Sequence, residues 1–166
     1  LKAEVRRRRG AHLMHVGMVL MFVGFAGEAY KTEKQVMLTE RQKVTVGRYT
    51  LRYDGATVTR DEQKEMLTTS LSAYLGAVHV ATLQPARWVY FKHENQPTSE
   101  VAIKRTLRED LFVALGSYDS RRNQAAFKVI INPLVNWIWL GFILLTVGAG
   151  VNMIPSRSDR KERRQT

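Results

Sequence analysis

Two long runs without a charged residue constrain the fold of this chain more than any other feature. The first, 11–26, contains no Asp, Glu, Lys or Arg, and neither does the second, 133–155. The hydrocarbon core of a bilayer takes about 20 residues of helix, with about 17 to 25 tolerated. Both runs therefore predict membrane-crossing helices. For the first run, a buried core helix or a signal peptide with a charged start is the alternative.

The basic ends of the chain predict its topology. Five Lys or Arg residues against one Glu stand in the first ten positions, and five against two acidic residues in the last eleven. Clusters of Lys and Arg beside a span remain on the cytoplasmic side. We therefore expect both ends in the cytoplasm and the middle segment outside it. Basic arms that bind nucleic acid are another interpretation of the net charge of +11. Beside two spans, topology is the simpler explanation, and we expect no nucleic-acid partner.

The predicted fold is a membrane α + β protein, in which two transmembrane helices flank a small antiparallel β-rich extracytoplasmic domain. The expected segments are a cytoplasmic basic end (1–10), a first transmembrane helix (11–29), the β-rich domain (30–131), a second transmembrane helix (132–155) and a cytoplasmic basic tail (156–166).

The middle segment alternates apolar and polar residues over short stretches. "KVTVGRYTLRYDG", "GAVHVATLQP", "SEVAIKRT", "DLFVALGSYD" and "AAFKVII" all show this pattern, with turn residues between them. Six or seven short strands at such spacing predict an antiparallel sandwich or an open barrel. Gly47 resembles a bulge within a strand, "YDG" resembles a turn, and 61–75 fits either a helix or a strand.

The middle segment carries no recognisable catalytic motif. His79 lies in an alternating stretch and His93 in a polar loop, and neither has a partner at metal-ligand spacing. The charges of "REDLF", including Glu109 and Asp110, fit an ordinary strand entry with solvated side chains. The chain has no cysteine, which excludes a thiolate nucleophile and iron–sulfur or zinc–cysteine ligands. We therefore expect a binding or scaffolding domain and assign no catalytic residue.

His12 and His15 stand within the first apolar run, where an ionisable side chain is costly and needs a reason. Residues three apart share a face of a helix. Three roles fit: a hydrogen-bonded packing residue, a proton relay, or an axial ligand to a haem. One helix supplies one axial ligand, so a second would come from elsewhere. Gly17, Gly24 and Gly27 offer small surfaces for a neighbouring helix.

The second run has its own local signals. Asn132–Pro133 fits a helix start, because proline is tolerated at an early helical position. Trp137 and Trp139 follow within two turns, where tryptophans anchor a span at the membrane interface. Asn136 and Asn152 are candidates for hydrogen bonds between helices.

Five segments occur together in an order that resembles one known family. "RRRRGAHLMHVGMVLMFVG", "GRYTLRYDG", "LQPARWVYF", "REDLFVALGSYD" and "NPLVNWIWLG" are similar to the C-terminal part of CcmF, the large membrane subunit of cytochrome c haem lyase. The resemblance covers nearly the whole chain, and "DLFVALG" and "NPLVNWIWLG" are its most specific parts.

The resemblance implies a role in handling haem. CcmF-like proteins receive haem from the carrier CcmE, work with CcmH-type thiol proteins, and attach haem to CXXCH motifs of apocytochrome c outside the cytoplasm. The family also holds a b-type haem between two transmembrane histidines, one of them in the span before the C-terminal outer domain. His15, in "MHVGMVL", matches that position and is the implied axial ligand of the haem iron. The second ligand would come from another chain or a missing segment, and nothing carries over to His12.

The departures from the family limit what the chain can do. It has two predicted spans rather than many, it lacks the tryptophan-rich WWD segment, and it begins with Leu rather than Met. We therefore expect a fragment, a split-gene product or a recruited subunit that is inactive in isolation. Its expected partners are the remaining CcmF-like spans, CcmE, a CcmH-type protein, apocytochrome c and the lipid of the inner membrane. The alternative is a non-catalytic accessory subunit of a larger membrane complex. Half of a transporter is the weakest interpretation, because no inverted repeat is present.

Overall fold

The computed structural model describes residues 2–91 and 97–154, so His93 lies outside the described residues. The chain divides into two compact units: a helical unit, Leu1–Ala29 with Pro133–Thr166, and a β unit, Tyr30–Asn132. The two predicted helices and the antiparallel β-rich domain are confirmed.

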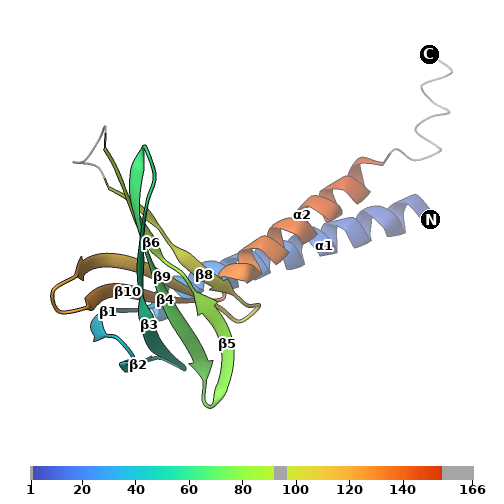
Figure 1. Cartoon of the computed structure of the whole chain (residues 1–166). Coiled ribbons are helices and arrows are strands. Elements are labelled where there is room, and N and C mark those ends of the chain that lie inside the picture. The colour runs from blue at the N-terminus through green and yellow to red at the C-terminus, as the bar shows by residue number, and fades with distance from the viewer. Residues whose placement is uncertain (1, 92–96, 155–166) are drawn as a thin grey trace. The chain divides into compact units, whose positions relative to one another are not determined.

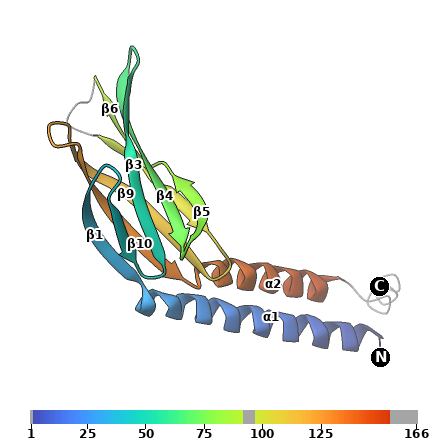
Figure 2. The ribbon, with the colours of Figure 1, turned by 60° about the horizontal axis from the view of Figure 1, so that its bottom comes forward.

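The helical unit consists of α1 (Lys2–Ala26) and α2 (Val135–Met153), and a 3-10 turn (Gly27–Tyr30) follows α1. The two helices run side by side in both views (Figures 1 and 2). The arginine run is part of α1. The predicted helix start at Asn132–Pro133 is wrong, because strand pairing keeps the backbone extended there. Pro133 ends a strand, and Leu134 adopts the left-handed conformation (φ 63°) before α2 begins.

Both helices are long and apolar enough to cross a membrane by length and composition. Only 22% of the apolar window is buried in the first helix and 11% in the second. A core helix of a soluble protein buries most of its surface, so this exposure argues against that alternative for the first run.

Glycines bring the two helices into backbone contact. Gly10, Gly17 and Gly24 recur every seven residues on α1 and face α2, which presents Gly141 and Gly148 in return. A Cβ atom added at Gly17 would lie 2.6 Å from the Gly141 carbonyl oxygen, and one at Gly148 would lie 2.8 Å from the Gly10 carbonyl oxygen. We call this contact the glycine seam. It confirms the close approach predicted at Gly17 and Gly24.

Polar contacts join the N-terminal end of α1 to the C-terminal end of α2. The Asn152 side-chain amide donates a hydrogen bond to Met14 Sδ at 3.4 Å, which confirms Asn152 as a link between the helices. The Arg6 guanidinium donates to the Ile154 carbonyl oxygen at 2.6 Å. Because these contacts join the N-terminal end of one helix to the C-terminal end of the other, the helices are antiparallel.

The β unit is a sandwich of two sheets (Figure 2). A four-stranded sheet has the order β1-β10-β9-β8, and a six-stranded sheet has the order β2-β3-β4-β6-β7, with β5 also pairing with β4. The strands are β1 (Thr32–Thr39), β2 (Lys43–Val46), β3 (Tyr49–Arg60), β4 (Lys64–Leu75), β5 (Val78–Leu83), β6 (Ala86–Tyr90), β7 (Thr98–Glu100), β8 (Ala102–Arg105), β9 (Glu109–Asp119) and β10 (Gln124–Pro133).

Two local predictions in the β unit are corrected. Gly47 does not form a bulge: it lies at φ +56° in the turn of the β2–β3 hairpin, where glycine is favoured. The bulge lies instead within "YDG", between Tyr53 and Gly55, so that stretch bends a continuous strand rather than ending it. The ambiguous stretch 61–75 is largely strand, because β4 gains ladder hydrogen bonds from β3, β5 and β6.

The core of the sandwich lies between the inward faces of the two sheets. Tyr53 and Phe127 pack edge to face at its centre, with ring centroids 5.4 Å apart. The other buried apolar residues follow the predicted alternation along the strands: Leu38, Val46, Tyr49, Leu51, Leu71, Ala73, Leu83, Leu111, Val113, Leu115, Ala125, Val129 and Ile131.

Candidate functional site

His15 has an exposed side chain with one defined partner. Its Nδ1 lies 2.7 Å from the carbonyl oxygen of Ala11, one turn earlier on α1. A carbonyl oxygen can only accept a hydrogen bond, so Nδ1 carries the proton in this contact. The lone pair of the neutral ring then lies on Nε2, which points away from the backbone. This is the tautomer that ligates a metal through Nε2.

His12 has the same arrangement one turn closer to the arginine run. Its Nδ1 lies 2.6 Å from the carbonyl oxygen of Arg8, and its side chain is also exposed. By geometry alone, the Nε2 of either histidine could ligate a metal. The choice of His15 over His12 therefore rests on the resemblance alone and stays a prediction.

Both histidines point away from the glycine seam. His15 is five positions from Gly10, which at 3.6 residues per turn turns it about 140° from the seam, and His12 lies about 160° from it. They therefore lie on the side of α1 that α2 leaves uncovered. Further along α1, Val19 and Phe22 are also exposed, at 59% and 65%. This surface is apolar apart from the two imidazoles, and it suits an apolar ligand or another helix.

The β unit contains a polar cavity that shows no reactive group. The cavity has a volume of about 300 Å³ and is lined by residues that include Glu40, Asp54 and Asn123. Glu40 accepts a hydrogen bond from the Asn123 amide at 2.7 Å. Asp54 accepts from Arg52 and from Ser72, each at 2.5 Å. Both carboxylates are thus already engaged by neighbouring side chains.

His79 has a structural environment. Its Nε2 lies 3.2 Å from the Thr82 hydroxyl, and its ring packs edge to face on Tyr74. Within the described ranges, no group of three or more His, Cys, Asp or Glu residues is placed to hold a metal ion. The candidate site considered further is therefore the histidine pair on α1.

Burial changes the acidity of two tyrosines in the sandwich. Desolvation, followed by the nearby Tyr118 and Glu40, raises the pKa of Tyr53 to about 12. Desolvation and then the charge of Glu109 raise the pKa of Tyr49. Both phenols therefore stay neutral well above physiological pH and act as core residues.

Sequence reasoning missed two structural features. Gly10, Gly141 and Gly148 belong to the glycine seam, and their seven-residue spacings were the available signal. Glu109 was interpreted as a solvated charge, but it is 8% exposed and pairs with Arg48 at 3.4 Å. No signal in the sequence joins these two residues, which are sixty-one positions apart.

Taken together, the structure defines a protein in which an antiparallel β-sandwich is inserted between two apolar helices of membrane-spanning length. Residues 29–133 match the family model described as the CcmF C-terminal beta-sandwich, and the chain belongs to this family.

The relatives of this chain include cytochrome c biogenesis proteins. It is 27% identical over 157 residues to the cytochrome c-type biogenesis protein CcmF of Pseudomonas aeruginosa, covering 89% of this chain and 22% of that protein. It is 28% identical over 155 residues to CycK of Rhizobium meliloti, covering 93% and 22%. A solved structure of cytochrome c heme lyase CcmF superposes with a TM-score of 0.72 at 18% identity, over 92% of this chain and 26% of the other, which shows a shared fold. The chain thus spans about a fifth of the length of these curated relatives.

Proposed function

We propose that this chain serves as the C-terminal portion, or a separate subunit, of a CcmF-like haem lyase in the inner membrane, and that His15 supplies one axial ligand to a haem b. The observation that carries the proposal is the exposed His15 imidazole, whose Nδ1 proton is held by the Ala11 carbonyl oxygen. The family membership of the chain and the match of "MHVGMVL" to a ligand position support it.

The residues of α1 and α2 prepare this ligand. The hydrogen bond from Nδ1 fixes both the tautomer and the rotation of the ring, so that the lone pair of Nε2 is available to a metal. The glycine seam packs α2 against the opposite side of α1, which leaves the histidine side for the haem and for the chain that supplies the second ligand. When bound, haem b would supply a one-electron redox centre, whose potential the axial ligands tune.

We further propose that both ends of the chain are cytoplasmic and that the sandwich is extracytoplasmic, as the basic ends indicate. There the sandwich would meet CcmE, a CcmH-type thiol protein and apocytochrome c. The lyase reaction forms thioether bonds between haem vinyl groups and cysteine thiols. We infer that this chain positions haem and partners and that bond formation requires the rest of the assembly.

The test is the visible redox spectrum and haem content of the natively purified assembly with His15→Ala or His12→Ala. His12 is the matched control, because it has the same backbone contact and lies on the same side of α1. We expect His15→Ala to lose or shift the b-type signal while the complex still assembles, and His12→Ala to retain it.

Two results would contradict the proposal. An unchanged b-type spectrum in His15→Ala would return this histidine to a packing role. A parent assembly that is complete but contains no haem would favour the non-catalytic accessory subunit, which acts through helix packing and docking of the outer domain.

A further inference from the structure

Several turns of the sandwich gather at the end where the chain enters and leaves it. Thr32 pairs with Ile131, which places the beginning of β1 and the end of β10 together. Gly47 lies against the Ile131 side chain, so the β2–β3 turn is at the same end. Since β9 runs back beside β10, its first residue, Glu109, lies there too, with the β8–β9 turn before it. We call this the entry end.

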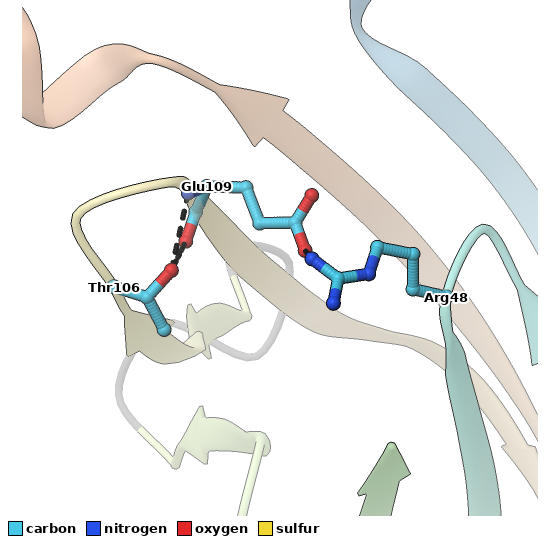
Figure 3. Close-up of polar contacts among 3 residues, drawn as sticks. All are labelled: Arg48, Thr106 and Glu109. Carbon is cyan, nitrogen blue, oxygen red and sulfur yellow. Dashed lines mark hydrogen bonds and ion pairs between the residues drawn. The ribbon is translucent and has the colours of Figure 1, made fainter. Parts of the chain in front are cut away.

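Hydrogen bonds hold the β8–β9 turn in one conformation (Figure 3). The Thr106 hydroxyl donates to the Glu109 carbonyl oxygen at 2.6 Å and accepts from the Glu109 amide at 3.1 Å. The Glu109 carboxylate in turn pairs with Arg48 of the β2–β3 turn at 3.4 Å. The two ends of the turn are thereby tied to each other and to the opposite sheet, which fixes the direction of the residues between them.

The side chains that this turn presents are apolar and basic. Leu107 is 81% exposed, and Arg105 and Arg108, which flank the turn and Leu107, are exposed as well. The neighbouring carboxylates, Glu109 and Asp110, are 8% and 9% exposed and contribute little to this surface. An exposed leucine between guanidinium groups suits contact with a lipid surface, because the apolar side chain can enter the acyl boundary while Arg binds phosphates.

The lengths of the connections favour lipid as the occupant of this surface. One residue separates the 3-10 turn after α1 from β1, and one residue separates β10 from α2. A fully extended residue spans at most about 3.6 Å, so neither connection can carry the entry end far from helices that cross a membrane. Where these helices leave the membrane, the first and last residues of the sandwich would therefore follow within a few residues of the lipid headgroups.

We propose that the β8–β9 turn of this protein is a membrane-surface contact, in which Leu107 enters the headgroup–acyl boundary and Arg105 and Arg108 bind lipid phosphates. This inference rests on the membrane-spanning helices of the proposed function but not on the haem. The contact would be a second attachment of the chain to the membrane, in addition to the two helices.

Because this chain contains no cysteine, one engineered cysteine can be labelled with a dye at a chosen position. Leu107→Cys is labelled with an environment-sensitive dye, and the full chain is reconstituted in liposomes of phosphatidylethanolamine and phosphatidylglycerol that carry a quencher on the lipid. Val58→Cys is the matched control, because Val58 is 56% exposed and lies near the β3–β4 turn at the opposite end of the sandwich. Val19→Cys, on the exposed side of α1, reports whether the helix is in the membrane. Arg108→Cys repeats the measurement if Leu107→Cys does not fold.

We expect a blue-shifted emission and lipid quenching at position 107, quenching at 19, and neither effect at 58. Quenching at 19 without quenching at 107 would overturn the surface contact and leave the membrane placement intact. A blue-shifted emission at 107 without lipid quenching would mean that protein, not lipid, covers the turn, and it would overturn the contact as well. Equal quenching at 58 and 107 would overturn the assignment to the entry end. No quenching at 19 would overturn both this inference and the membrane placement in the proposed function.

Discussion

Gly17→Ala should weaken the pairing of α1 with α2, although alanine is the better helix former. The added Cβ would lie 2.6 Å from the Gly141 carbonyl oxygen and 2.7 Å from the Leu145 amide nitrogen. Both are backbone atoms of a helix, so relief requires the helices to move apart. Gly150 is the matched control: it lies in α2 and a Cβ there meets nothing within 4 Å.

The expected magnitude follows from these distances. Overpacking of a close contact costs about 1–3 kcal/mol. Replacing a helical glycine by alanine gains up to about 1 kcal/mol in water where there is no clash. Gly150→Ala should therefore be neutral or slightly stabilising, and Gly17→Ala should weaken helix pairing by about 1–3 kcal/mol. The sign of the difference, rather than its size, tests the seam.

The assay is energy transfer between two dyes on engineered cysteines at Val5 and Met153. Both side chains are exposed, at 44% and 83%, and they lie at the end that Arg6 joins to Ile154. Titration of the reconstituted chain with a denaturing detergent then measures separation of the helices. If Gly17→Ala and Gly150→Ala separate at the same detergent fraction as the parent, the seam does not determine the pairing and the reasoning fails.

Two further predictions concern the sandwich. Because the pKa of Tyr53 is about 12 when folded and near 10 when unfolded, the unfolded state ionises first and stability falls as pH rises from 10 through 12, by up to about 2–3 kcal/mol. Tyr53→Phe should remove this loss without destabilising the protein at pH 7, since its buried hydroxyl has no hydrogen-bond partner among the described residues; denaturant unfolding at both pH values checks it. Gly47→Ala should cost more than Gly76→Ala in the same unfolding assay, because both have positive φ but only Gly47 faces a neighbour, the Ile131 side chain at 2.7 Å. Equal costs would contradict a contact-based explanation.

Local pattern predicted the two helices and many of the strands, although it did not identify β1 or β6. The two uncharged runs predict helices because a bilayer span needs a fixed length of apolar chain. The alternation in stretches such as 110–119 predicts strands, because successive side chains of a strand point to opposite faces. These are properties of neighbouring residues, and a single sequence displays them directly.

Strand pairing determined the local conformations that the sequence pattern did not specify. "VTVGRYT" and "YDG" each place a glycine within an alternating stretch, yet Gly47 makes a hairpin and Gly55 a bulge. The difference lies in the strands opposite them, which the local sequence does not specify. The stretch 61–75 became largely strand for the same reason, since its partners complete its backbone hydrogen bonds.

The candidate site divides in the same way. The sequence singled out His15 and predicted that it shares one side of a helix with His12, and the resemblance implied a role for it that stays a prediction. Only the tertiary structure showed that the glycine seam covers the opposite side of α1, and that the Ala11 carbonyl oxygen holds the ring. The burial of a side chain depends on segments that are distant in the sequence and pack against it. For this reason Glu109 is nearly buried beside Arg48, whereas Leu107, two residues earlier, is exposed.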